Sequence, residues 1–502
     1  METPGQFIIG ADCGTVIGTG HVMRCLALAQ AWKRAGGSVT FLVPDGLPAI
    51  EQRIRAEGCS LETLASEHFS QTVVGRLLHS IPGKVVLDGY GFGVHEQSAA
   101  SDAGHQVLTV DDFGHAPAYP VRWVLNQNVH ARPEMYSDRR SDTRLLLGPS
   151  YALLRDEFRP WLGWRRTVRE RAEKILVTIG GSDPSNLSLR ILESLPRLQR
   201  ADLEVVLVAG GSNPHLQDLQ AAQRKSPIQV RIVTNTLDMP AFMAWADVAI
   251  SAGGSTSHEL CYMGLPALLF VVAENQRGGA DHLSKLSVAV CAGGAGEFDS
   301  ARFTDALSHL IDAPEIRHAM SNRGRDLVDG LGAERVKGAL LNRELHLRLC
   351  RETDRQVLFS WANDPEVRHA SFHSDAVDWE GHQRWFTEKL IDPQSVIYIG
   401  ENQKGAPVGV VRFHLDQELA ILSVSVAPEF RGSGWGRELI TLSTQVLTRS
   451  RSTRRVEALV KPENRTSVRL FESSGFRRAG SAQVAGQPAL LFTWQCGSQS
   501  NA

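Results

Sequence analysis

The chain contains 502 residues, of which 42% are hydrophobic and 22% are charged, and its formal net charge at pH 7 is -2. This length exceeds what one hydrophobic core supports and predicts about three domains of roughly 150 residues each. The almost balanced charge argues against a general binder of nucleic acid or of anionic membranes.

The start of the chain and its cysteines indicate the compartment. Residues 1–5 lack the basic stretch and apolar core of a secretory signal, and no apolar run approaches the ~18 residues of a membrane span. The cysteines are scattered without a CxxC pair, which is typical of reduced thiols and predicts no metal site. We therefore expect a cytoplasmic protein without a metal, with thiols at Cys13, Cys25, Cys59, Cys261, Cys291, Cys350 and Cys496.

A parallel α/β pattern fills the first two thirds of the chain. Residues 7–11 predict a strand, and residues 21–37 predict a helix that ends at two glycines. Further apolar strands are expected at 39–44, 84–88, 105–112 and 122–128, and then at 174–181, 203–211, 228–235, 246–254 and 266–272. Continuous apolar runs indicate strands covered on both faces. The sequence thus predicts two successive Rossmann-like domains, residues 1–160 and 161–340.

The pattern changes near Glu344. Residues 345–354 open a mixed segment with alternating strands such as 422–428, which predicts a third α/β domain over residues 345–497. The tail, residues 497–502, is small and polar and is expected to fray.

Three glycine-bearing loops follow predicted strands, where α/β proteins bind ligands. They cover residues 18–21, 180–186 and 252–259. Glycine lets backbone N–H groups approach phosphate oxygens, and a helix N-terminus adds the positive end of its dipole. Each loop alone also fits a tight turn without a ligand, but together they favour a nucleotide diphosphate held between two domains.

Neither of two common phosphate-binding patterns is present. No Gly-Lys-Ser/Thr follows any of these loops, and Met23 stands where a G-x-G-x-x-G pattern needs its third glycine. These departures disfavour a kinase or a hydride-transfer enzyme. Glu259 lies one helical turn after Ser255, where its carboxylate either reaches a ribose diol or only favours the helix start.

Five stretches in a fixed order resemble the UDP-sugar hydrolases of bacterial pseudaminic acid biosynthesis. They are residues 17–29, 148–158, 178–186, 251–269 and 274–276. The resemblance covers about residues 7–340 and implies the two-domain GT-B architecture, related to the transferase that adds N-acetylglucosamine to lipid II. It also implies metal-independent, inverting hydrolysis of UDP-2,4-diacetamido-2,4,6-trideoxy-β-L-altropyranose to UDP and the free sugar.

The resemblance implies that His21, in the G-x-G-H pattern, is the catalytic residue. A neutral imidazole can accept a proton from the water that attacks the anomeric carbon. The adjoining Gly20 and the helix N-terminus can stabilise charge on the departing diphosphate. A purely structural role of His21 at the helix start is the alternative.

The resemblance places UDP in the second domain and the sugar in the first. It assigns the nucleotide-facing loop, the pyrophosphate and ribose contacts, and a substrate-site asparagine to Gly180, Gly181, Ser182, Gly254, Ser255, Glu259 and Asn275. Polar residues that end strands of the first domain are expected to shape the sugar pocket: Asp12, Asp88, Tyr90, Asp112 and Asn128. Relatives often carry arginine where this chain has Gly10, which removes a cation.

The third segment resembles the GNAT acetyltransferases. Residues 431–436 form an R-x-x-G-x-G pattern between a predicted strand and helix, and a second stretch follows at 464–476. In that family the loop N–H groups and the helix N-terminus hold the coenzyme A pyrophosphate. The resemblance thus implies acetyl-CoA as cosubstrate, bound by Arg431, Gly432, Gly434, Gly436 and Asn464.

Upstream stretches, residues 361–372 and 382–386, resemble the GNAT subgroup that acetylates the 4-amino group of UDP-aminosugars. The aromatic and polar residues there either line the acceptor side or pack two helices: Trp361, Asn363, Arg368, His382, Trp385 and Phe386. Phe471 replaces the tyrosine whose hydroxyl often protonates the departing thiolate. The sequence indicates no catalytic base for this domain; Glu418 and His414 lie nearby in the sequence, but no pattern supports either.

The sequence predicts a bifunctional enzyme, with UDP-sugars as substrates and no indication of oligomeric state. Acetylation of a UDP-4-amino-sugar would yield the substrate that the hydrolase cleaves. The alternative is a GT-B glycosyltransferase whose GNAT domain binds coenzyme A and regulates without chemistry.

Overall fold

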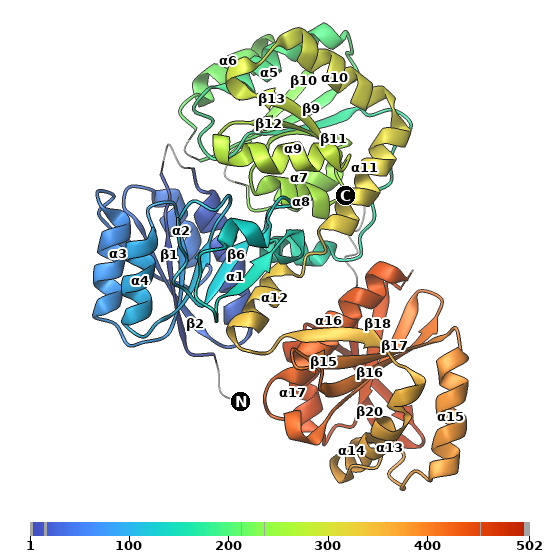
Figure 1. Ribbon diagram of the computed structural model, residues 1–502. Coiled ribbons are helices and arrows are strands. Elements are labelled where there is room, and N and C mark those ends of the chain that lie inside the picture. The colour runs from blue at the N-terminus through green and yellow to red at the C-terminus, as the bar shows by residue number, and fades with distance from the viewer. Residues whose placement is uncertain (1–3, 15–17, 212, 235, 452, 496–502) are drawn as a thin grey trace. The chain divides into compact units, whose positions relative to one another are not determined.

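The computed structural model describes residues 4–14, 18–211, 213–234, 236–451 and 453–495 (Figure 1). It divides into two compact units. The first unit contains Pro4–Arg159 and Arg165–Lys337, and the second contains Pro160–Trp164 and the chain from Gly338 onward. The first two predicted domains therefore correspond to two sheets of one unit.

The first sheet has seven parallel strands in the order β3-β2-β1-β4-β5-β6-β7. Its strands are β1 (Gln6–Ala11), β2 (Ser38–Pro44), β3 (Ser60–Leu64), β4 (Lys84–Asp88), β5 (Gln106–Val110), β6 (Trp123–Asn126) and β7 (Arg144–Leu147). Its helices are α1 (Gly20–Arg34), α2 (Pro48–Ala56), α3 (Phe69–Leu78) and α4 (Val94–Asp102). The strand order reverses between β1 and β4, so the loops after these strands border the crevice where such sheets bind ligands.

The second sheet has six parallel strands in the order β10-β9-β8-β11-β12-β13. Its strands are β8 (Lys174–Thr178), β9 (Glu204–Ala209), β10 (Gln229–Thr234), β11 (Val248–Ala252), β12 (Ala267–Val271) and β13 (Val290–Gly294). The helices are α5 (Leu187–Ser194), α6 (Leu216–Lys225), α7 (Met239–Trp245), α8 (Thr256–Tyr262), α9 (Arg277–Lys285), α10 (Ser300–Asp312), α11 (Pro314–Leu327) and α12 (Gly332–Leu340).

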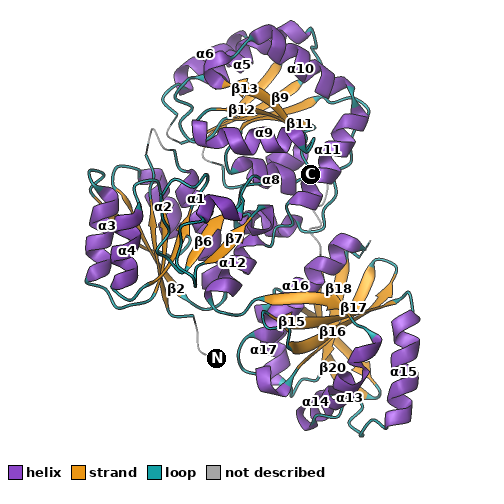
Figure 2. Ribbon diagram, viewed as in Figure 1, coloured by secondary structure: helices purple, strands orange, loops and turns teal. Residues whose placement is uncertain are grey.

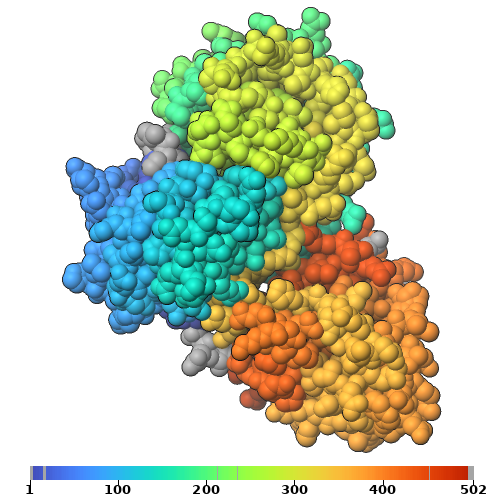
Figure 3. Space-filling model, in the orientation of Figure 1, coloured from blue at the N-terminus to red at the C-terminus, as the bar shows by residue number. Residues whose placement is uncertain are grey.

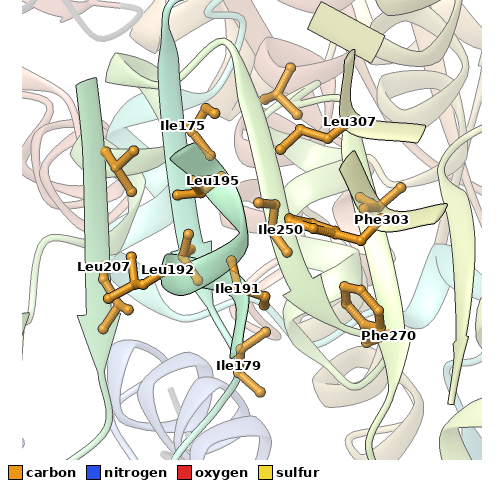
Figure 4. Packing of buried hydrophobic residues seen from close by; sticks show 14 of the residues in the cluster. Ile175, Ile179, Ile191, Leu192, Leu195, Leu207, Ile250, Phe270, Phe303 and Leu307 are labelled. Atoms are coloured by element: carbon orange, nitrogen blue, oxygen red, sulfur yellow. The ribbon is translucent and has the colours of Figure 1, made fainter. Parts of the chain in front are cut away.

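The apolar strands of this second sheet are buried by helices, as their continuous hydrophobic runs predict. Ile175 of β8 and Ile250 of β11 lie in one buried cluster with Ile191 of α5 and Phe303 of α10 (Figure 4). This packing holds the sheet rigid while its loops remain available at the carboxyl ends of the strands.

The second unit contains a mixed sheet in the order β14-β15-β16-β17-β18-β20-β19. Its strands are β14 (Leu345–Leu349), β15 (Ser395–Asn402), β16 (Pro407–Asp416), β17 (Leu419–Val426), β18 (Arg455–Val460), β19 (Arg477–Val484) and β20 (Gln487–Gln495). Its helices are α13 (Arg355–Ala362), α14 (Pro365–Ala370), α15 (Trp379–Ile391), α16 (Trp435–Ser450) and α17 (Arg465–Ser473) (Figure 2).

The middle of this sheet is open between β17 and β18. These strands are parallel, and their pairing is confined to Leu419–Ile421 opposite Arg455–Glu457. Beyond these residues β17 continues to Val426 beside β16, and β18 continues to Val460 beside β20. Each strand thus has one unpaired edge facing the gap, and β17 leads from it into the glycine loop before α16.

The predicted fold class is confirmed: two parallel Rossmann-like sheets precede a C-terminal GNAT-like sheet. The described cysteines are all free thiols, and Cys496 and the tail 497–502 lie outside the described residues. None of the described helices combines the length and hydropathy that a membrane crossing requires.

Candidate active site

A cleft of about 920 Å³ lies between the two sheets of the first unit. Loops at the carboxyl ends of strands in both sheets line it, as expected for α/β folds. The surfaces of the two halves meet in the space-filling view, where cyan residues of the first half abut lime-green residues of the second (Figure 3). The cleft brings together twelve of the predicted site residues: Gly20, His21, Tyr90, Asp112, Asn128, Gly180, Gly181, Ser182, Gly254, Ser255, Glu259 and Asn275.

Glycine loops from the two halves approach one another closely. A Cβ atom built on Gly181 would lie 3.1 Å from the Thr19 Oγ1 atom, and one built on Gly20 would lie 3.7 Å from the Ser255 Oγ atom. Gly180 has a φ of 105°, which favours glycine. The start of α1 therefore faces two glycine loops of the second sheet, at residues 180–186 and 252–259, across a narrow gap.

His21, the second residue of α1, lies in the cleft wall with a side chain that is 7% exposed. Its Nδ1 atom is 2.6 Å from Asp88 Oδ1. Because the Asp88 carboxylate is an acceptor, Nδ1 is the nitrogen that carries the proton in a neutral His21 ring, and Nε2 of that ring keeps a lone pair. Within the described residues, Nε2 makes no hydrogen bond. The His21 side chain is thus arranged as an oriented proton acceptor.

Arg24 binds the same carboxylate as His21. Its Nε atom donates to Asp88 Oδ2 and its Nη2 atom donates to Asp88 Oδ1, each at 2.7 Å, while Nη1 donates to Asp112 Oδ1 at 2.7 Å. Burial alone would raise the pKa of Asp88, but the charge of Arg24 and the hydrogen bonds from Arg24 and His21 outweigh it and hold that pKa well below its usual range. The pKa of Asp112 is also lowered, because Arg24 outweighs its burial.

Tyr90 and Asn275 connect the two halves of the unit. The Tyr90 hydroxyl donates to Asp112 Oδ2 at 2.9 Å and accepts a hydrogen bond from Asn275 Nδ2. Asn128 Nδ2 donates to Asp112 Oδ1 at 3.0 Å. Burial and the nearby Asp112 charge raise the pKa of Tyr90, so the phenol remains a neutral donor. One chain of polar contacts therefore runs from His21 to the second half.

Asp88 and Asp12 lie elsewhere than expected. The Asp88 side chain is fully buried behind His21 and does not line the cleft, because its oxygens are occupied by His21, Arg24 and the Cys25 thiol. Asp12 lines a separate cavity of about 480 Å³ beside β1, and burial raises the pKa of its carboxyl. Both had been predicted as substrate-binding residues.

The glycine at position 10 is tightly enclosed. A Cβ atom there would lie 2.9 Å from Val73 Cγ1 and 3.5 Å from Phe92 Cζ. Apolar side chains therefore occupy the space that an arginine at this position would need.

Glu259 lines the cleft but is paired. Arg155 Nη2 donates to Glu259 Oε1 at 2.9 Å. Burial raises the pKa of Glu259, and the charge of Arg155 opposes this shift. Two site residues were not among those predicted from the sequence: Arg155, which belongs to the stretch 148–158 that carries the resemblance, and Arg24, a buried cation on α1.

The second unit places its predicted cofactor glycines at the start of α16. Gly432 and Gly434 have φ values of 71° and 88°, which non-glycine residues rarely adopt. A Cβ atom on Gly436 would lie 3.2 Å from Leu470 Cδ2. Asn464 caps α17, because its Oδ1 accepts from Ser467 N at 3.0 Å.

Arg431 does not point freely into this loop. Its Nη2 atom is 2.6 Å from Asp364 Oδ1, its Nη1 atom is 3.1 Å from Glu366 Oε2, and its Nε atom donates to Val426 O. The side chain thus ties the loop to α14. Direct binding of pyrophosphate by Arg431, as the resemblance implied, would require these ion pairs to rearrange.

The predicted acceptor-side residues mostly pack or brace helices. Trp361, His382 and Phe386 are buried, and His382 Nε2 is 3.1 Å from the Arg355 carbonyl oxygen. Asn363 makes hydrogen bonds with both backbone groups of Val377. These contacts favour the packing alternative. Three of the set stay partly exposed, namely Asn363, Arg368 and Trp385.

Phe471 lies in the apolar core of the second unit. Its ring is 4% exposed and contacts the rings of Phe476 and Phe492. The described residues hold no group of three or more His, Cys, Asp or Glu side chains that could bind a metal ion.

Comparisons with known proteins divide the chain as the structure does. Residues 175–321 match the model of the glycosyltransferase family 28 C-terminal domain, and residues 344–477 match that of the acetyltransferase (GNAT) domain. The chain thus resembles the glycosyltransferase family 28 C-terminal domain over the first of these ranges and the GNAT acetyltransferases over the second.

Three relatives add to these similarities. An uncharacterised protein of Methanocaldococcus jannaschii is 23% identical over 94% of this chain and 97% of its own length. The UDP-2,4-diacetamido-2,4,6-trideoxy-β-L-altropyranose hydrolase of Campylobacter jejuni is 24% identical over 56% of this chain and 96% of its own length. The N-acetylglucosamine transferase that acts on N-acetylmuramyl-(pentapeptide) pyrophosphoryl-undecaprenol in Acidithiobacillus ferrooxidans is 26% identical over 64% of this chain and 94% of its own length. The resemblance to the UDP-sugar hydrolases is thus confirmed, and the first relative spans both units.

Proposed function

We propose that the first unit hydrolyses a UDP-sugar of the 2,4-diacetamido-2,4,6-trideoxy class to UDP and the free sugar with inversion and without a metal. The observation that carries this proposal is the His21–Asp88 pair, with Nε2 unbonded in the cleft wall beside glycine loops of both halves. The similarity to the Campylobacter jejuni hydrolase supports the choice of substrate.

In this reaction His21 Nε2 accepts a proton from water as the water oxygen bonds to the anomeric carbon. The bond between that carbon and the β-phosphate oxygen breaks, and the electron pair leaves with UDP. Backbone N–H groups around Gly20 and Gly254 face the departing diphosphate from the two halves and stabilise its charge. Attack from the side opposite to UDP inverts the anomeric centre.

The test is UDP release by a His21→Asn variant. General-base catalysis contributes roughly 10²–10⁴-fold, so we expect a loss in that range while UDP affinity stays within a few-fold. His95→Asn is the matched control, because the His95 side chain is 89% exposed. A loss of less than tenfold in His21→Asn would remove His21 from the role of base.

A second candidate is glycosyl transfer, in which a sugar hydroxyl takes the place of water. The similarity to the Acidithiobacillus ferrooxidans transferase favours it. The two activities differ in a simple measurement. Hydrolysis releases UDP from the UDP-sugar alone at the full rate, whereas a transferase needs an acceptor, and mass spectrometry of the product identifies water or sugar as the nucleophile.

We propose that the second unit transfers an acetyl group from acetyl-CoA to the 4-amino group of the UDP-sugar precursor. The GNAT match, the glycine loop before α16 and the open edges of β17 and β18 support binding of the cosubstrate. Acetyl-CoA supplies the activated acyl group. Acetylation followed by hydrolysis would place both steps in pseudaminic or a related nonulosonic acid pathway, in the cytoplasm.

The acetyl-transfer proposal is tested with the full chain, acetyl-CoA and candidate UDP-4-amino-4,6-dideoxy sugars. We expect an acetylated product and free coenzyme A in equal amounts. Coenzyme A binding without any product across these sugars would instead support a regulatory domain.

A further inference from the structure

Arg24 lies three residues after His21, and positions three apart share one face of a helix. Its side chain is 7% exposed, and the guanidinium lies between two carboxylates. We propose that Arg24 is a positioning residue that keeps the His21 imidazole neutral and correctly oriented for proton abstraction. This inference rests on the UDP-sugar hydrolysis proposed above.

The Asp88 carboxylate is saturated by its partners. Oδ1 accepts from His21 Nδ1 and from Arg24 Nη2, and Oδ2 accepts from Arg24 Nε and from the Cys25 thiol at 3.3 Å. Because this side chain is fully buried, no water competes for these oxygens. Arg24 thereby fixes the plane of the carboxylate, and the carboxylate fixes the imidazole.

The charges around His21 would otherwise favour its protonated form. Asp88 and Asp112 both attract a proton to the imidazole, and an imidazolium cannot act as a base. The Arg24 Nη2 atom is 3.0 Å from His21 Nδ1, so a positive ring would lie directly beside a positive guanidinium. Arg24 therefore offsets one carboxylate and disfavours protonation of His21.

Other charged or titratable groups also face this pair. Asp12 after β1, Tyr90 after β4 and His258 of α8 interact with His21 or Arg24. Burial lowers the pKa of His258 to about 4, so His258 is neutral near pH 7. Asp12 is a further acidic group near His21. The positive charge of Arg24 therefore has more negative charge to offset if His21 is to remain neutral.

The same guanidinium supports the contact between the halves. Nη1 and Nη2 donate to both oxygens of Asp112, at 2.7 and 3.2 Å. Asp112 accepts from Tyr90, which in turn accepts from Asn275 of the second half. Orientation of the base and positioning of the substrate-side asparagine are thus coupled through one arginine.

The primary test is an NMR titration of the His21 ring in protein labelled at histidine, with the signal assigned by its loss in His21→Asn. Arg24→Met removes the cation but keeps an apolar stem of similar length. We expect the His21 midpoint to rise by about 1–3 pH units, the usual effect of a nearby charge. Arg24→Lys retains one charge without the fork of donors, and we expect a smaller rise.

Steady-state UDP release gives a second readout. If a neutral His21 is the base, we expect kcat/KM of the wild type to rise with pH, and we expect the rise in Arg24→Met to occur at higher pH. The expected loss at pH 7 is about tenfold or more, carried mainly by kcat, because most of His21 is then protonated. Arg34→Met is the matched control on α1: its guanidinium pairs with Asp156 and Glu334, away from His21.

The results separate this inference from the function on which it rests. If the wild type releases no UDP, the hydrolase proposal fails, and the NMR midpoint still tests Arg24. If Arg24→Met loses activity equally at every pH and the His21 midpoint is unchanged, Arg24 is only structural and the inference is wrong. If Arg24→Met does not fold, Arg24→Lys decides: a raised midpoint supports the inference and an unchanged one overturns it.

Discussion

The cleft of the first unit and the glycine loop of the second unit offer contrasting ways to build a site for a nucleotide-bearing substrate. In the cleft, the buried carboxylate of Asp88 contacts both the His21 imidazole and the Arg24 guanidinium. In the loop, positive φ values at Gly432 and Gly434 present the backbone, while Arg431 is engaged elsewhere. A side-chain site is therefore sensitive to charge and pH, and a backbone site is sensitive to added bulk.

The largest expected effect tests the side-chain site. Asp88→Asn replaces a buried acceptor with an amide that can donate to His21 Nδ1 and so favour the wrong tautomer. We expect UDP release to fall by roughly 10²–10⁴-fold, as for loss of the base itself. Asp102→Asn, at the exposed end of α4, is the control. Full activity in Asp88→Asn would show that the carboxylate does not orient the base.

Bulky side chains in the glycine loop of the second unit should weaken coenzyme A binding by steric hindrance. Gly434→Val with Gly436→Val forces a strained φ and pushes a side chain toward Leu470. Such strain costs roughly 1–2 kcal/mol per residue, so coenzyme A affinity measured by calorimetry should fall by about tenfold or more. Gly405→Val, in a turn with φ 75° outside the loop, controls for strain alone. Equal affinities in the double variant and the wild type would contradict the assignment.

We expect a smaller loss of coenzyme A affinity when Arg431 is changed. This result would distinguish binding by the loop backbone from binding by a side chain. Because its guanidinium pairs with Asp364 and Glu366, Arg431→Ala should lower coenzyme A affinity only a few-fold. Partly exposed pairs of this kind contribute about 0.2–1 kcal/mol. A double-mutant cycle with Asp364→Asn should show coupling between the two residues. A loss beyond 100-fold in the single variant would mean that Arg431 itself binds the phosphates.

The smallest effect is expected at Phe471. Its ring packs between aromatic neighbours in the core, so Phe471→Tyr adds a hydroxyl to a mostly apolar environment. We expect acetyl transfer to change by about threefold or less, far below the range of acid catalysis. Phe476→Tyr, on the neighbouring ring, is the matched control. If the wild type is inactive and Phe471→Tyr is active, the missing phenol is the limiting group.

The sequence was sufficient to predict most strands of the two parallel sheets and the glycine loops, because these depend on local periodicity and turn chemistry. It did not predict β3, β7 or β13. It could not predict the partners of Arg24, which lie 64 and 88 residues away in the chain. Asp88 and Tyr90 both follow the same apolar run, yet one is buried behind the base and the other lines the cleft. The direction in which each side chain points depends on how the strands pair, and this direction cannot be predicted from the amino-acid composition of the stretch.

The acceptor-side residues of the second unit show the same limit of sequence-based prediction, here for residues that were expected to bind a ligand. His382 and Phe386 stand in a polar-aromatic stretch that fits a binding surface as well as a helix interface. Helices α13 and α15 pack together, and the rings lie inside that packing. Only tertiary contacts distinguish the two interpretations.

The gap between β17 and β18 has a consequence for handling the protein. Past Ile421 and Glu457, each strand presents unpaired N–H and C=O groups in the middle of a sheet, where pairing with a strand of another molecule is favourable. A ligand that fills the gap both caps these groups and stabilises the native state by mass action, by about 2.7 kcal/mol at a concentration 100 times its Kd. Stored without coenzyme A, the chain should therefore aggregate from this unit first, and at a lower temperature than with it.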